Sequence, residues 1–181
     1  MKTIFLVLSI FLLGNSADAQ FTSASLQASG LTCSMCSKAV RNALEEVNFV
    51  EKVQVDIKNQ QYNLSFKKGD DVDFDALSKA VVDAGFAVAD MKVTIDVKEI
   101  KADRDAHFSI GDKYFHLLNA SGKQLKGPTK FTIVDKQFVS AKMFKKYALA
   151  SQMSCVKTGR VANCCTKNGF TPASRVYHVI I

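Results

Sequence analysis

The five cysteines of this 181-residue chain are spaced in ways that could support thiol chemistry. Two residues separate Cys33 from Cys36, and Cys155 lies nine positions before the adjacent pair Cys164 and Cys165. A Cys-x-x-Cys pair can hold a soft metal ion as two thiolates, act as a redox dithiol, or close a structural disulfide. The elements around the cysteines must decide among these chemistries.

Apolar periodicity between Thr22 and about Lys98 predicts the order strand, helix, strand, strand, helix, strand. Acidic residues favour a helix start near Asp73, and Gly85 is well placed to end that helix. This βαββαβ order predicts an α+β, ferredoxin-like fold, with both helices on one face of an antiparallel sheet. The expected strands cover 22–31, 53–57, 62–66 and 93–97, and the expected helices cover 34–47 and 73–84.

The first strand-to-helix loop carries the run Gly30-Leu31-Thr32-Cys33-Ser34-Met35-Cys36. Two cysteines three positions apart at a helix start lie near one face, so both sulfurs can reach a single ion. Free N–H groups and the positive end of the helix dipole stabilise thiolate over thiol there. The sequence therefore predicts that Cys33 and Cys36 form one bis-thiolate site.

Three segments within residues 22–96 carry a resemblance to a known family: Gly30-Leu31-Thr32-Cys33-x-x-Cys36, Lys38-Ala39-Val40 and Val82-Asp83-Ala84-Gly85-Phe86. With them, residues 22–96 resemble the heavy-metal-associated domain family, which includes copper chaperones, modules of copper-transporting ATPases and the periplasmic mercury-binding protein. The resemblance implies that Cys33 and Cys36 bind the metal. It also implies that Leu31, where the family usually has Met, packs beneath the loop, and that Phe86 shields the site.

Thiolate ligands select soft ions, which makes Cu(I), Hg(II) and Zn(II) the candidates for the Cys33–Cys36 pair. Structural zinc needs four ligands and this loop offers two sulfurs, which suits a low-coordinate ion such as Cu(I) or Hg(II), and we take Cu(I) as the first candidate. The open coordination positions would let a partner's thiolate take the ion. We therefore expect a metal carrier, not an enzyme, that exchanges its ion with a metal-donor or metal-acceptor protein, a membrane metal transporter among them.

Three alternatives for the Cys33–Cys36 pair stay open: a thiol–disulfide redox protein, a mercury(II) scavenger and a structural disulfide. The chain has no Trp beside the pair, and its two prolines, Pro128 and Pro172, lie far downstream. Both observations disfavour the redox alternative, because thiol oxidoreductases commonly have an aromatic Trp-Cys lead-in to the cysteine pair. The predicted order of strands and helices is also not that of a thioredoxin-like fold. A disulfide across so short a loop gains little entropy.

Residues 1–19 predict a cleaved signal peptide, with Lys2, the apolar run Ile4–Leu13 and the small-x-small site Ala17-Asp18-Ala19. The apolar run is shorter than the roughly 20 residues that span a bilayer. We therefore expect a periplasmic or secreted chain with no transmembrane segment after signal cleavage.

Charge divides the rest of the chain into two parts. Residues 20–99 hold 9 basic and 12 acidic residues, a net charge of −3, whereas residues 100–181 hold 14 and 4, a net charge of +10. This asymmetry predicts a heavy-metal-associated domain at 20–98 and a basic domain of unknown role at 99–181. Export argues against nucleic acid as the partner of the basic half, which we expect to contact a protein partner or close over the cysteine pair.

The sequence predicts a small β-rich α+β fold for residues 99–181, with an OB-like barrel as one alternative. Expected strands cover 114–118, 130–134 and 176–181, and Ser140 is expected to cap a helix. The charged stretch 99–106 is expected to be a linker or a continuing strand.

Cys155, Cys164 and Cys165 fall in a stretch, 152–173, that is predicted to be irregular. In an exported protein, a disulfide from Cys155 to Cys164 or Cys165 is favoured, and a second soft-metal site or buried free thiols are the alternatives. His107, His116 and His178 show no ligand spacing along the chain, and His178 is expected to be an ordinary strand residue.

Overall fold

The structure, a computed structural model, describes residues 21–119, 121–166 and 169–181. The predicted signal peptide at 1–19 lies outside these residues. In the first half, the observed order is that of a ferredoxin-like fold, with sheet order β2-β3-β1-β4. Its elements are β1 (Phe21–Ser29), α1 (Ser34–Glu45), β2 (Val50–Asp56), β3 (Gln61–Phe66), α2 (Phe74–Asp83) and β4 (Ala87–Lys101).

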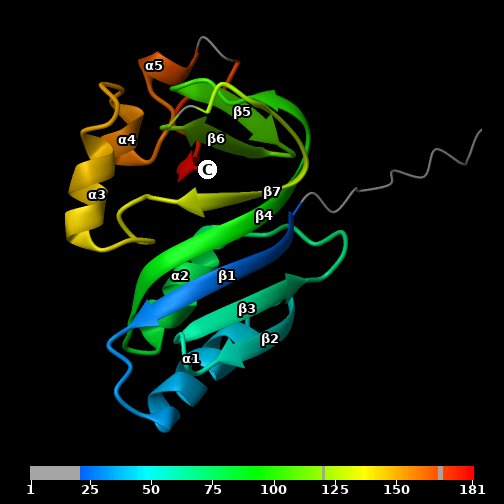
Figure 1. Cartoon of the computed structure of the whole chain (residues 1–181), viewed down its shortest axis with the longest axis vertical. Helices are drawn as coiled ribbons and strands as arrows, with labels where there is room; N and C mark the ends of the chain where they lie inside the picture. Colours follow the sequence, from blue (N-terminus) through cyan, green and yellow to red (C-terminus); the bar gives the residue numbers. More distant parts are fainter. Residues whose placement is uncertain (1–20, 120, 167–168) are drawn as a thin grey trace, which may run out of the picture.

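The two helices of this half form where apolar residues recur at helical spacing. In α1, Val40 and Leu44 are buried on one face, and in α2 the buried side includes Leu77 and Val81. The Asp73 side chain accepts a hydrogen bond from the Asp75 N–H and so caps α2. Both helices lie on the same side of the sheet, packed against each other (Figure 1). The six elements predicted from residues 22–98 are therefore confirmed. Five agree within three residues at each end, and the last strand, predicted at 93–97, is longer and covers Ala87–Lys101.

The second half extends the same sheet. Strand β7 (Gln124–Ile133) pairs antiparallel with β4. Strand β8 (Val176–Ile180) pairs antiparallel with β7 and parallel with β6 (Lys113–Leu117). Strand β5 (Ala106–Ile110) pairs antiparallel with β6 and is the edge strand. The result is one eight-stranded sheet in the order β2-β3-β1-β4-β7-β8-β6-β5 (Figure 1). The helices of this half are α3 (Ala141–Ala148), α4 (Cys155–Thr158) and α5 (Asn163–Thr166).

Strand β4 joins the two halves. It pairs with β1 along one edge and with β7 along the other, so the edge strand of the ferredoxin-like unit is covered. One core cluster includes Phe74 from α2 together with Phe115, Phe131 and Tyr177 from the second half. The division at residues 98 and 99 stays a prediction; that point lies within β4, and the core cluster draws residues from both sides of it.

The OB-like barrel suggested for 99–181 is not confirmed, because the strands of this half continue an open sheet and do not form a separate row. The predicted strands and the Ser140-capped helix are present as β6, β7, β8 and α3. Strand β5 was not separately predicted, and the stretch expected to be irregular contains the two short helices α4 and α5.

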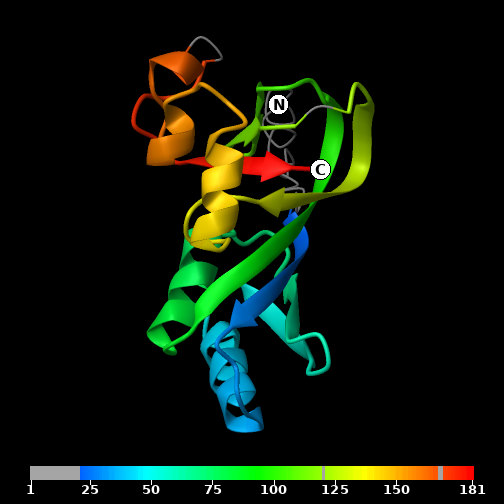
Figure 2. The same cartoon turned by 60° about the vertical axis from the view of Figure 1, so that its left-hand side comes forward.

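The two cysteine sets lie at opposite ends of the molecule. The loop before α1 is at the lower end in both views, and α4 and α5 are at the upper end (Figure 2). The expectation that the basic half closes over the Cys33–Cys36 pair is therefore not met in this arrangement. Among the described residues, no helix is both long and apolar enough to span a bilayer.

Candidate functional site

The Cys33–Cys36 pair lies where β1 gives way to α1. Gly30 turns the chain with φ of +87°, a left-handed conformation that glycine adopts without strain. Cys33 takes the N-cap position with an extended backbone, and its carbonyl oxygen accepts the Ser37 N–H at 3.3 Å. Its side chain caps no N–H group, so the N–H groups of the first turn are free to face a negative charge.

The two sulfurs of the pair are near one another and reachable from solvent. Cys33 Sγ lies 2.9 Å from Cys36 Sγ; Cys33 is exposed and Cys36 is half-buried. The hydrogen bond from the Cys33 thiol, with smaller help from Thr32, lowers the pKa of Cys36 to about 7 from an ordinary value of 9.0. One of the two sulfurs is therefore already substantially ionised near neutral pH.

Packing beneath the loop holds the first turn of α1 in place. The hydroxyl of Tyr62, a fully buried residue of β3, donates to the Ser37 carbonyl oxygen at 3.2 Å. Leu31 and Phe86 pack as partly buried residues against the core, and a Cβ on Gly30 would touch the Phe86 ring at 3.9 Å. Leu31 thus packs against the core, which agrees with the packing role that the resemblance implied. Met35, between the cysteines, stays 70 % exposed.

The second cysteine set gathers around α4 and α5. All five cysteines of the chain are free thiols, so the disulfide expected from Cys155 is not confirmed. The sulfurs of Cys155, Cys164 and Cys165 nevertheless lie within 4.8 Å of one another. Cys155 and Cys165 are fully buried, and burial raises the pKa of the Cys155 thiol.

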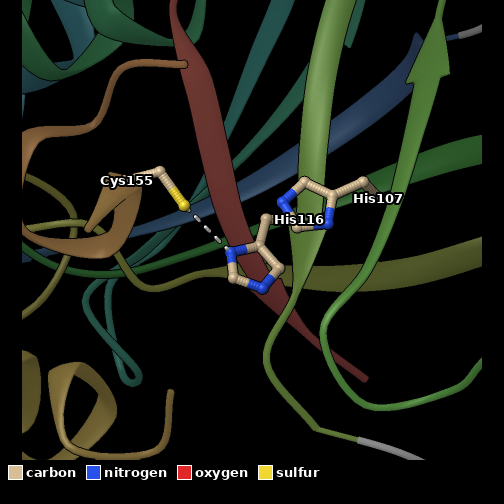
Figure 3. A group of neighbouring side chains, drawn as sticks. All are labelled: His107, His116 and Cys155. Atoms are coloured by element: carbon tan, nitrogen blue, oxygen red, sulfur yellow. Dashed lines mark hydrogen bonds between the residues drawn. The ribbon is translucent and has the colours of Figure 1, made fainter. Parts of the chain in front are cut away.

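The same cluster contains histidines that the sequence did not connect. In the register of the sheet, His107 of β5 lies opposite His116 of β6, and His116 lies beside His178 of β8. The rings of His107 and His116 stack with centroids 4.2 Å apart, and His116 Nδ1 is 3.6 Å from Cys155 Sγ (Figure 3). Burial, followed by the neighbouring histidines, lowers the pKa of His116 to about 4, so its ring is neutral near pH 7.

A signal for this histidine pair was present in the sequence. Gly111-Asp112 is a two-residue turn of the type that joins hairpin strands, and His107 and His116 are equally distant from it. Recognising the hairpin would have paired the two residues. No comparable local signal brings Cys155 to them, because 39 residues separate it from His116.

The fold and the site define a class: a small ferredoxin-like domain with an exposed pair of thiols at a helix start. The sequence pattern of the heavy-metal-associated domain matches residues 25–87. This segment of the chain belongs to that family, as the resemblance suggested.

Solved structures similar to this segment include MerP, a metallochaperone and a copper-binding domain. Oxidised MerP from Ralstonia metallidurans CH34 is 31 % identical, and the match covers 38 % of this chain and 94 % of MerP with a TM-score of 0.34. The CopZ metallochaperone is 26 % identical, with 38 % and 100 % covered and a TM-score of 0.34. A copper-binding domain of a P-type ATPase is 26 % identical, with 40 % and 92 % covered and a TM-score of 0.35. No curated protein sequence matches the chain.

Proposed function

We propose that this protein binds a soft metal ion through Cys33 and Cys36 and transfers it to another protein, without catalysing a reaction. The observation that carries the proposal is the pair of sulfurs 2.9 Å apart at the start of α1, in a segment that belongs to the heavy-metal-associated family. Among the described residues, no third cysteine, histidine or carboxylate groups with this pair. Two thiolates suit a low-coordinate ion, so Cu(I) is the favoured cargo, with Hg(II) and Zn(II) as alternatives.

The geometry of the pair supports loading and release. Linear coordination at a metal–sulfur distance of about 2.3 Å would hold the sulfurs about 4.6 Å apart. They must therefore separate on binding, and rotation of the exposed Cys33 side chain can do this without moving the buried core. An incoming thiolate from a partner can then join the ion, give a three-coordinate intermediate, and leave with it.

Features of the loop suit contact with a partner protein. Met35 exposes 70 % of its surface directly between the two cysteines, and an exposed thioether side chain adapts to different apolar surfaces. We infer that the partner is a metal-donor or metal-acceptor protein, a membrane metal transporter being one candidate. The predicted signal peptide supports a periplasmic or secreted location, where the pair would need to stay reduced or metal-loaded.

The decisive experiment titrates the reduced chain, residues 20–181, with Cu(I), Zn(II) and Hg(II) against a competing chelator. The Cys33→Ser/Cys36→Ser variant should lose one tightly held Cu(I). A matched variant, Cys164→Ser/Cys165→Ser, also removes two thiols and should keep that ion. Unchanged Cu(I) and Hg(II) affinity in the first variant would refute the assignment.

The same proteins distinguish the redox alternative. Catalysed reduction of a disulfide substrate that disappears only in Cys33→Ser/Cys36→Ser would support a thiol–disulfide enzyme in place of a carrier. Absence of such catalysis, together with Cu(I) transfer to a second thiol-containing protein, is the expected result.

A further inference from the structure

The cluster around Cys155 has no part in the function proposed for the N-terminal loop, yet it brings together several metal-ligating side chains. Two overlapping groups meet there, one of Cys155, Cys164 and Cys165 and one of His107, His116 and Cys155. Within each group, the candidate ligand atoms lie no more than 4.8 Å apart. Cys155 belongs to both groups and is therefore the centre of the cluster.

Both imidazoles donate a hydrogen bond to one residue, Asp105, which fixes the orientation of the two rings. The Asp105 carbonyl oxygen lies 2.9 Å from His107 Nδ1, and its carboxylate lies 2.9 Å from His116 Nε2. Both oxygens can only accept, so these two nitrogens carry the hydrogens. The lone pairs are thereby left on His107 Nε2 and His116 Nδ1. A carboxylate that fixes the tautomer of a ligating histidine is the usual second layer of a metal site.

One of these lone pairs is buried without a partner. Among the described residues, His107 Nε2 is one of two buried side-chain polar atoms that make no hydrogen bond. A buried acceptor left unpaired costs free energy, so such an atom calls for an explanation. Figure 3 shows the outer nitrogen of the His107 ring on the side of Cys155. An ion bound between these residues would satisfy it.

We propose that Cys155, His116 and His107, with one thiol of the Cys164–Cys165 pair, form a second metal site that takes a thiophilic divalent ion such as Zn(II). Two cysteines and two histidines are a common tetrahedral zinc set. With zinc–sulfur at about 2.3 Å and zinc–nitrogen at about 2.0 Å, tetrahedral geometry places sulfur and nitrogen about 3.5 Å apart. Cys155 Sγ and His116 Nδ1 are already 3.6 Å apart.

Charge decides between Zn(II) and the Cu(I) favoured at the N-terminal loop. Two thiolates and two neutral imidazoles around Zn(II) give a net charge of zero, and the two thiol protons leave to solvent. The same ligands around Cu(I) would leave one negative charge in a site where Cys155 and His116 are fully buried. Uncompensated charge is costly in such surroundings. The two sites thus differ in chemistry as well as in place.

The fold holds the ligands on regular elements and leaves the cluster accessible from solvent. His107 and His116 stand on paired strands, and Cys155 opens α4, so three of the ligands come from rigid elements. His107 and Cys164 also line one surface hollow, together with Asp105 and Met153. This hollow gives an ion a path from solvent to the cluster.

The test begins from reduced Cys33→Ser/Cys36→Ser protein of residues 20–181, which isolates the second site. It should bind one equivalent of Zn(II) in competition with a chromophoric chelator. Co(II) in its place should show thiolate charge-transfer absorption and the strong visible bands of a tetrahedral ion. No bound Zn(II) in this reduced protein overturns the proposal.

Two further variants separate a metal site from a merely structural cluster. His107→Phe keeps a ring stacked on His116 and removes the nitrogen, so it should abolish the tetrahedral Co(II) spectrum while circular dichroism stays native. Asp105 has φ of +59°, a conformation that Asn also tolerates, so Asp105→Asn should keep the backbone and weaken Zn(II) binding about 10- to 100-fold. The neighbour Asp103, whose half-exposed carboxylate pairs with Lys101 and bonds neither histidine, provides the matched control, and Asp103→Asn should leave the affinity unchanged.

The fourth ligand is assigned by changing one thiol at a time. Either Cys164→Ser or Cys165→Ser should weaken Zn(II) binding and alter the Co(II) spectrum, while the other leaves both nearly unchanged. Zn(II) that persists with full affinity in His107→Phe and in both serine variants would overturn the proposed ligand set. A disulfide from Cys155 that forms in air and blocks Zn(II) uptake reversibly would agree with the same thiols serving as ligands.

Discussion

Removing the Cys33 thiol should raise the pKa of Cys36 in the metal-free protein. The hydrogen bond from Cys33 is the largest cause of a pKa of about 7, and the contacts from Thr32 are smaller. In Cys33→Ala the contacts from Thr32 and from the residue 33 backbone remain, but the largest cause is gone, so the pKa should move toward the ordinary value of 9.0. In the wild type, this pKa describes the first proton lost from the interacting pair.

The size of the effect follows from two opposing trends. At pH 7, a complete return to 9.0 would cut the Cys36 thiolate fraction from about one half to about 1 %, a decrease of about 50-fold. A thiolate of higher pKa is a better nucleophile, by about 6- to 10-fold for two pKa units. Alkylation of Cys36 at pH 7 should therefore slow by at most about 5- to 8-fold, whereas near pH 10 the variant should react faster than the wild type.

Iodoacetamide labelling followed by peptide mass spectrometry measures these rates from pH 6 to pH 10. The labelling of each cysteine must be measured separately, because the pKa of Cys164 is also about 7. Burial would raise the pKa of Cys164, but hydrogen bonds from the Cys155 backbone and the Ser154 side chain outweigh it. Thr32→Val serves as the control and should shift the midpoint less than Cys33→Ala does. A midpoint that stays near pH 7 in Cys33→Ala, with no crossing of the two rate profiles, would refute the reasoning.

Two further predictions concern stability, measured by urea unfolding of the metal-free chain. The Arg175 guanidinium donates to the buried Asp135 carboxylate at 3.0 Å, and His178 continues to bond that carboxylate when Arg175 is removed. Arg175→Ala should therefore lower the free energy of unfolding by about 1.5–3 kcal/mol. Lys79→Ala breaks an exposed ion pair on α2 and should cost about 0.5 kcal/mol or less; equal effects of the two substitutions would contradict this account. Tyr62→Phe removes the hydroxyl that bonds the Ser37 carbonyl oxygen and should lower the free energy of unfolding by about 0.5–1.5 kcal/mol. The Cys33–Cys36 site should still bind one Cu(I). Loss of Cu(I) binding in a folded variant would show that this contact does more than hold α1.

The sequence by itself determined the first half of the fold, because that information is local. Alternation in strands and helical spacing in α1 and α2 are properties of neighbouring residues, and the single segment 30–36, which ends in the first turn of α1, contains both cysteines of the N-terminal site. A site whose ligands lie within four positions of one another needs only the right local element to bring its atoms together.

Only the tertiary structure decided how the second half is built and what surrounds Cys155. The pairing of β4 with β7 joins the halves in one sheet, and the parallel pairing of β6 with β8 links segments about sixty positions apart. Neither contact has a local signal, since strand partners are chosen by packing across the whole core. The same long-range pairing brings Cys155 to His116, a contact that spacing along the chain could not predict.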